Sequence, residues 1–152
     1  MAKKTRRSYA ELDNILGRHY ADNNFCALVA VCVATDASAG KVKRYVEKFA
    51  KTWEGHKRVH RRGTPFEVIK ASLNRFGKEH DPDWNEHSHA RSGYTLNRVH
   101  KELALMHPND TFHVYVRGHV SCIREGILED WTAKKPSRRK VTHVFRVIDR
   151  TS

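Results

Sequence analysis

The feature that most constrains this chain is an apolar run from Ala27 to Thr35, which contains no charged side chain. Asn23 or Asn24 just before the run is a suitable N-cap, so the pattern predicts a helix from Phe25 to Thr35. A helix that is apolar on every side has no face to present to water and is buried. The rest of the chain is therefore expected to pack around this segment.

The composition is that of a single globular domain. With 152 residues, of which 39% are hydrophobic and 30% charged, the chain is long enough to bury a core. We expect one domain over residues 1–152, with a basic tail at residues 1–7. No stretch has the length of a membrane span, and no apolar signal segment follows the basic start. A cytoplasmic protein without a membrane partner is therefore expected.

Helical periodicity and its start and stop signals predict four further helices. They cover Ser8–Tyr20, the segment opened by Ser38, the segment between Thr64-Pro65 and Gly77, and the segment between Thr95 and Pro108. The second of them is amphipathic, with its basic residues on one side. The polar stretches Gly55–Gly63 and Lys78–Ser92 are predicted to be loops.

After Pro108 the apolar pattern changes from helical to alternating, which is typical of strands. The predicted strands are Thr111–Val116, His119–Ile123, Ile127–Trp131 and Val141–Ile148, with turns at Arg117-Gly118 and Glu125-Gly126 and a basic loop at 134–139. Because helices come first and an antiparallel sheet comes last, the predicted class is α+β.

The three cysteines are predicted to be thiols in different surroundings. An odd number is a poor disulfide framework, and Cys26 and Cys32 lie on different faces of one helix. Cys32 and Cys122 are expected to pack in the core as small apolar groups. Cys26 stands at the helix N-terminus, where the helix dipole favours the thiolate. It would be a nucleophile beside an imidazole, and His119 at the start of a late strand is the candidate base.

The turn at Glu125-Gly126 relates His119 to an acidic residue. A tight turn there makes the numbers of paired residues sum to about 249–251. An odd sum places Asp130 on the same face of the sheet as His119. A carboxylate in that position would fix the imidazole tautomer and stabilise its cation. The alternative is that Asp130 is a turn residue before Trp131.

The net charge of +12 is concentrated in blocks. Residues 1–7 carry four positive charges, residues 41–62 carry nine against two acids, and residues 134–140 carry five. Such blocks suit contact with phosphate backbones or with an acidic partner. The alternative is a solvated helix face and a basic loop.

The predicted loop 78–92 contains three histidines, His80, His87 and His89, and acidic residues between them. Imidazole and carboxylate groups can ligate zinc. However, they lie in a polar loop without regular spacing to a third fixed ligand. We therefore expect no metal and no cofactor.

The order of these motifs resembles a family of small papain-like cysteine peptidases found mainly in bacteriophages and bacteria. The resemblance runs from about Asp22 to Val147 and is most specific in Tyr115–Asp130, which reads Tyr-Val-Arg-Gly-His-Val-Ser-Cys-Ile-Arg-Glu-Gly-Ile-Leu-Glu-Asp. It implies a papain-like fold, with N-terminal helices packed on a C-terminal antiparallel sheet. For a phage-encoded chain it also implies the host cytoplasm.

Carried over by residue, the resemblance implies Cys26 as nucleophile, His119 as base and Asp130 as orienting group. Papain-like enzymes commonly have an oxyanion-hole glutamine six residues before the nucleophile, and here that position is Tyr20. Asn24, with the backbone N–H of Cys26, is the expected donor instead. The residues expected to contact a bound partner are Trp131, which could instead close the core, and Lys134, Lys135, Arg138 and Arg139.

The sequence therefore predicts a thiol hydrolase that acts on a protein or peptide, with amide transfer and deamidation left open. The alternative is a catalytically inactive papain-like scaffold that serves as a basic binding module for nucleic acid or a host protein. The departure at Tyr20 keeps that alternative open.

Overall fold

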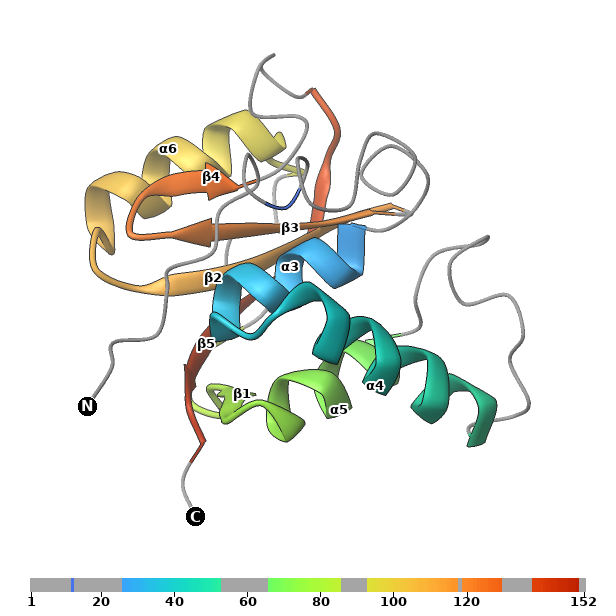
Figure 1. Ribbon diagram of the computed structural model, residues 1–152. Helices are drawn as coiled ribbons and strands as arrows, with labels where there is room; N and C mark the ends of the chain where they lie inside the picture. Colours follow the sequence, from blue (N-terminus) through green and yellow to red (C-terminus); the bar gives the residue numbers. More distant parts are fainter. Residues whose placement is uncertain are drawn as a thin grey trace.

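The computed structural model (Figure 1) describes Leu12 and residues 26–52, 66–85, 93–117, 119–129 and 138–150. Its helices are α3 (Cys26–Thr35), α4 (Ala39–Thr52), α5 (Phe66–Arg75) and α6 (Leu96–Met106). Its strands are β1 (Lys78–His80), β2 (Thr111–Val116), β3 (His119–Arg124), β4 (Ile127–Glu129) and β5 (Val141–Asp149). The predicted helix Ser8–Tyr20 lies outside the described residues except for Leu12, and the predicted loop Gly55–Gly63 lies outside them entirely.

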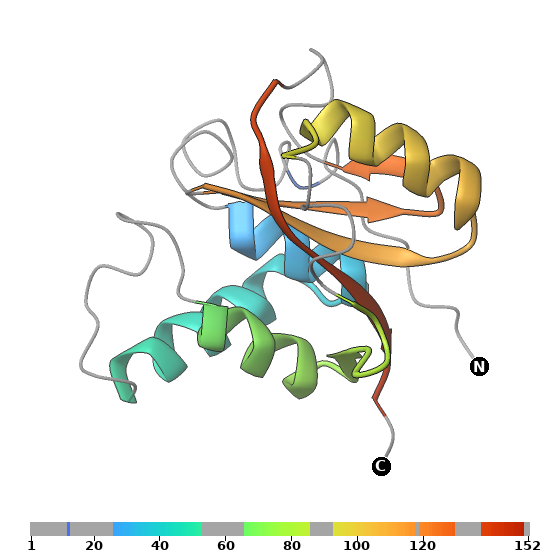
Figure 2. The same cartoon turned by 180° about the vertical axis from the view of Figure 1, so that it is seen from behind.

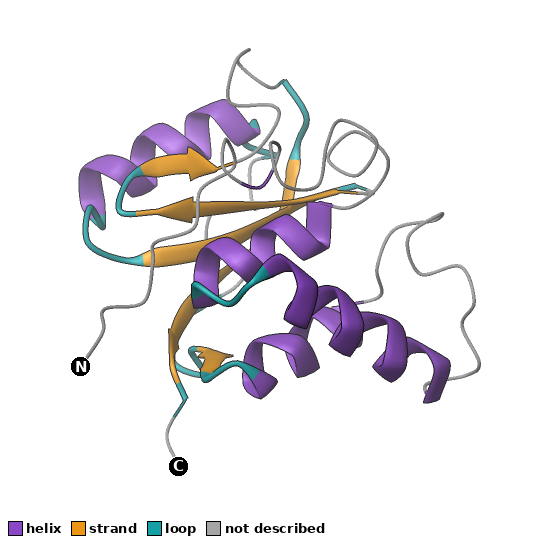
Figure 3. Ribbon diagram, in the orientation of Figure 1, coloured by secondary structure: helices purple, strands orange, loops and turns teal. Residues whose placement is uncertain are grey.

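The five strands form one antiparallel sheet in the order β1-β5-β2-β3-β4. Helix α6 covers one face, and α3, α4 and α5 lie on the other, as Figures 2 and 3 show. The α+β class predicted from the sequence is thus confirmed. Among the described helices, none combines the length and the apolar character of a membrane span.

Helix α3 is the centre of the fold, as its composition predicts. Every residue from Ala27 to Ala34 is at most 5% exposed. One side of the helix packs on β3, and α4 and α5 contribute Val42, Val46 and Leu73 to the same core. The helix lies between the sheet and an outer helical layer, which explains why it has no polar face.

A second core lies between the sheet and α6. Thr95 caps this helix, since its side-chain oxygen accepts a hydrogen bond from the backbone N–H of Arg98. Apolar residues of α6, β2, β3 and β5 pack together there, among them Leu103 and Phe112. Both faces of the sheet are therefore buried, unlike a sheet with one face in water.

The prediction that residues 78–92 form a loop is wrong at its start. Lys78–His80 form strand β1, which pairs antiparallel with β5, and Lys78 is opposite Asp149. Gly77, with φ of 90°, lies between α5 and this strand. The three residues of β1 have no alternating apolar pattern because they lie at the edge of the sheet, so local sequence gives no strand signal.

Candidate functional site

Two long-range contacts fix the direction of α3 relative to β3. At the middle of the helix, Nε2 of His113 lies 2.9 Å from the carbonyl oxygen of Ala30, and His113 pairs with Cys122 of β3. Near the helix end, Nη1 of Arg124 donates to the carbonyl oxygen of Val33 at 2.9 Å. The helix and the strand therefore run side by side in the same direction.

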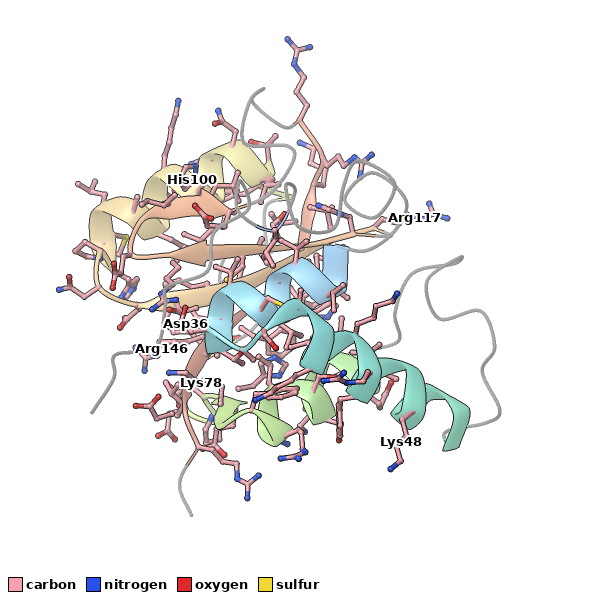
Figure 4. All side chains as sticks on the ribbon, viewed as in Figure 1. Asp36, Lys48, Lys78, His100, Arg117 and Arg146 are labelled. Carbon is pink, nitrogen blue, oxygen red and sulfur yellow. The ribbon has the colours of Figure 1, made fainter. Side chains whose placement is uncertain are left out.

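It follows that α3 and β3 begin at the same end of the molecule. From Ala30 back to Cys26 the helix covers about 6 Å, and from Cys122 back to His119 the strand covers about 10 Å. Figures 1 and 2 both show the start of α3 beside the end of the β2–β3 hairpin. Arg117, labelled in Figure 4, marks that end. The structure thus brings together the two elements that begin with the predicted nucleophile and base.

The ring of His119 leaves β3 on the side of the sheet that α6 covers. His119 is 8% exposed and lies opposite Val116 of β2, which belongs to the core beneath α6, as does Ile123. Val120 and Cys122 point the other way, into the core beneath α3. The ring would therefore have to reach the start of α3 around the end of the strand and not across the face that α3 packs on.

Ser121 shares the face of His119 and is fully buried. Sequence reasoning did not single it out, although a serine inside an apolar strand is a visible signal. Two buried polar side chains on one face make this end of β3 unlike the rest of the strand, because buried polar groups are a cost unless they are used or paired.

The hairpin β3–β4 has the register on which the prediction for Asp130 depends. Cys122 pairs with Glu129 and Arg124 with Ile127, which gives an odd sum of 251. The side chain of Cys26 lies outside what the structure describes. The same holds for five other predicted residues of this site: Asn24, Asp130, Trp131, Lys134 and Lys135.

The end of the basic loop is described, and it lies beside the hairpin. Arg138 and Arg139 are exposed and lie three and two residues before Val141, which pairs with Val116 at the end of β2. The backbone N–H of Leu96 donates to the carbonyl oxygen of Arg139 at 2.9 Å, which holds this segment against the start of α6. Two of the predicted binding residues are therefore at the same end of the sheet as His119.

The other two cysteines are core residues, as predicted. Cys32 and Cys122 are both 0% exposed, lie in the core beneath α3 and form no disulfide. Their thiols are shielded from solvent in the folded protein, so they fit the packing role expected for buried cysteine.

The feature that sequence reasoning missed is a pair of histidines: His113, which is fully buried, and His80, which is half-buried. The rings of His113 and His80 are 6.3 Å apart, centroid to centroid, and His80 stacks on Phe145 at 4.4 Å. Nδ1 of His113 and Nε2 of His80 are buried without a hydrogen-bond partner among the described residues. Because the Ala30 carbonyl can only accept, Nε2 of His113 carries the proton that it donates.

Burial governs the charge state of both rings. It lowers the pKa of His113 from 6.5 to about 4, against a smaller raising effect of the bond to Ala30. Burial, followed by the nearby His113 and Lys70, lowers the pKa of His80 to about 3. Both rings are therefore neutral at physiological pH. Within the described part of the chain, no three histidine, cysteine or acidic side chains lie close enough together to hold a metal ion.

Comparison of the chain with protein-family models, with curated proteins and with solved structures finds no match.

Proposed function

We propose that this chain is a thiol hydrolase with a papain-like arrangement, in which Cys26 attacks an amide carbonyl and His119 acts as base. The observation that carries the proposal is the side-by-side course of α3 and β3, which begin with Cys26 and His119 at one end of the molecule. No other pair of described elements begins with a nucleophile and a base in this way.

The proposed reaction is acyl transfer in two steps. The Cys26 sulfur forms a bond to the substrate carbonyl carbon, the C–N bond breaks, and His119 gives the proton taken from the thiol to the leaving amine. A water molecule then attacks the thioester, with His119 as base, and releases the acid and the free thiol. The expected substrate is a protein or peptide.

The environment of α3 supports a reactive thiol at its start. The helix has ten residues and its described side chains are buried, so its dipole acts in surroundings that screen charge poorly. This favours the thiolate of a cysteine at the first position. In the proposal, Asn24 and the backbone N–H of Cys26 bind the oxyanion. Asp130 orients His119, and the odd register of β3–β4 agrees with this role of Asp130.

The second candidate is a catalytically inactive scaffold that binds nucleic acid or an acidic host protein. The exposed side chains of Arg138 and Arg139 at the end of the sheet favour it. A scaffold of this kind retains Cys26 and His119 without coupling their protonation.

The test is the pH dependence of alkylation by iodoacetamide, followed by mass spectrometry of each cysteine. Burial protects Cys32 and Cys122 in the folded protein, so a faster rate at Cys26 alone is not sufficient evidence. The diagnostic result is an inflection for Cys26 clearly below the free-thiol value of about 8.5. If the protein is the proposed hydrolase, the inflection of Cys26 moves toward the free-thiol value in His119→Ala, because the imidazolium no longer stabilises the thiolate.

Two controls complete the experiment. Alkylation in denaturant should bring all three cysteines to one ordinary profile, which shows that the fold causes the shift. A thiol-directed activity probe should then label the wild type but neither Cys26→Ala nor His119→Ala. An inflection for Cys26 at the free-thiol value, unchanged in His119→Ala, would support the inactive scaffold and contradict the hydrolase.

A further inference from the structure

Helix α4 carries a straight stripe of exposed cations. Lys41, Arg44 and Lys48 are all exposed, and their spacing of three and then four residues places them on one side of the helix. Val42 and Val46, on another side, are at most 2% exposed and pack in the core beneath α3. The stripe is therefore the outward face of an amphipathic helix.

The position of α4 leaves this stripe facing solvent. Figures 1 and 2 show α4 on the far side of α3 from β2 and β3, in the outer layer with α5. Lys48, labelled in Figure 4, points away from the described part of the chain. The exposed charged residues of α5 are Glu67, Lys70 and Arg75, which add one further net positive charge.

We propose that the α4 stripe binds the phosphate backbone of a nucleic-acid duplex. From Lys41 to Lys48 the helix covers about 10.5 Å. Each strand of a B-form duplex has a phosphate for about every 3.4 Å of duplex axis, so the stripe is about as long as three base-pair steps. The net charge of +12 and the isoelectric point near 9.9 are in the range of proteins that bind nucleic acid.

A phosphate backbone fits this face better than an acidic protein does. Protein interfaces have an apolar or aromatic centre. Among the described side chains, the large apolar ones that are exposed are Leu105, Met106 and Ile127, which lie on α6 and β4 and not on α4. Cations without an apolar centre suit regularly spaced phosphates.

A duplex also fits better than a single strand. Single-strand binding uses open aromatic rings on which bases stack. Tyr45 is the described aromatic residue of α4, and it is half-buried with its ring 6.0 Å from that of Phe76 in an edge-to-face contact. Because its ring packs against Phe76, Tyr45 does not present an open ring on which a base could stack, and the stripe offers only charge.

The experiment measures binding of a fluorescently labelled DNA duplex by anisotropy over about 50–200 mM salt. The test variant is Lys41→Gln, Arg44→Gln and Lys48→Gln; glutamine is a good helix former, so α4 should persist. The control variant, Arg98→Gln, Lys101→Gln and Arg150→Gln, removes the same charge from exposed positions on α6 and just after β5.

We expect the test variant to bind about 10- to 100-fold more weakly at about 100 mM salt, and its salt dependence to fall by about 2–3 in log–log slope. The control variant should stay within about threefold of the wild type, and a Lys41→Arg, Lys48→Arg variant should retain binding.

Three results would overturn the proposal. They are the absence of duplex binding at low salt, an equal loss in the test and control variants, and displacement by polyglutamate as efficient as displacement by unlabelled duplex at equal charge. The second result would assign binding to net charge, and the third would assign the stripe to acidic peptides. None of these variants touches Cys26 or His119, so the outcome is independent of the proposed hydrolase.

Discussion

Acidification from about pH 7 to about 5 should destabilise this fold through the buried His113 and the half-buried His80. In the folded protein the pKa of His113 is lowered to about 4 and that of His80 to about 3, chiefly by burial. Unfolding exposes both rings and restores the ordinary value of 6.5. Below that value the unfolded chain binds more protons than the folded one. Stability is therefore complete above pH 6.5 and is lost as the pH falls.

The size of the loss follows from the shifts. Each ring contributes a slope of about 1.4 kcal/mol per pH unit, so between pH 6.5 and 5 the loss is about 2 kcal/mol for each histidine and about 4 kcal/mol for both. Domains of this kind are stable by about 5–15 kcal/mol, so this loss is large. Ordinary carboxylates titrate near pH 4, so in this window the histidines dominate.

Urea unfolding at a series of pH values measures this slope. His113→Gln keeps a donor for the Ala30 carbonyl but does not titrate, so its slope should be smaller by about 1.4 kcal/mol per pH unit. His100→Gln is the control: His100 is half-buried and bonds the carbonyl oxygen of Gly126, and its loss leaves the buried pair intact. Equal slopes for the wild type and His113→Gln would refute the reasoning.

Two further predictions concern the β3–β4 turn and the end of α3. Gly126→Ala should destabilise the protein by about 1–2 kcal/mol in thermal unfolding, because φ at this position is 79° and the new Cβ would lie 3.4 Å from an α6 side chain. The control Gly40→Ala should stabilise the protein slightly, because Gly40 lies in a helix and a Cβ there would have nothing within 4 Å. Arg124→Met loses an ion pair with Asp36 and a carbonyl bond, and should cost about 1–3 kcal/mol in urea unfolding. The surface variant Arg98→Met should change stability by less than about 1 kcal/mol, and a reversed order would contradict the role of Arg124.

Most elements of the fold could be predicted because their signals are local. The apolar run of α3, the cap at Thr95 and the turn at Glu125-Gly126 are all read within a few residues, and both turn residues have positive φ. Strand β1 was not predictable in this way, because pairing with β5, far along the chain, is what makes Lys78–His80 a strand.

The histidine pair was missed because the alternating pattern of a strand shows that it has two faces but does not show which element packs on each face. In the strand Thr111–Val116, His113 alternates with Phe112 and Val114 and so falls on the opposite face from these two apolar residues. Helix α3 covers that face and removes the ring from water. Likewise, the contact of Arg124 with Val33 decides which end of α3 lies by which end of β3, and no local pattern encodes it.

The same long-range contacts link stability to the proposed chemistry. His113 bonds α3 at Ala30, about 6 Å along the helix from Cys26, so the charge that its ring gains in acid is buried against the helix that carries the proposed nucleophile and destabilises the packing there. Protonation of His119 would stop its proposed action as a base, so in the proposed hydrolase both events would reduce activity as the pH falls. His113→Gln separates them. An acid limb that persists in this variant belongs to His119, whereas a limb that disappears together with the acid-induced loss of stability belongs to the buried charge on His113.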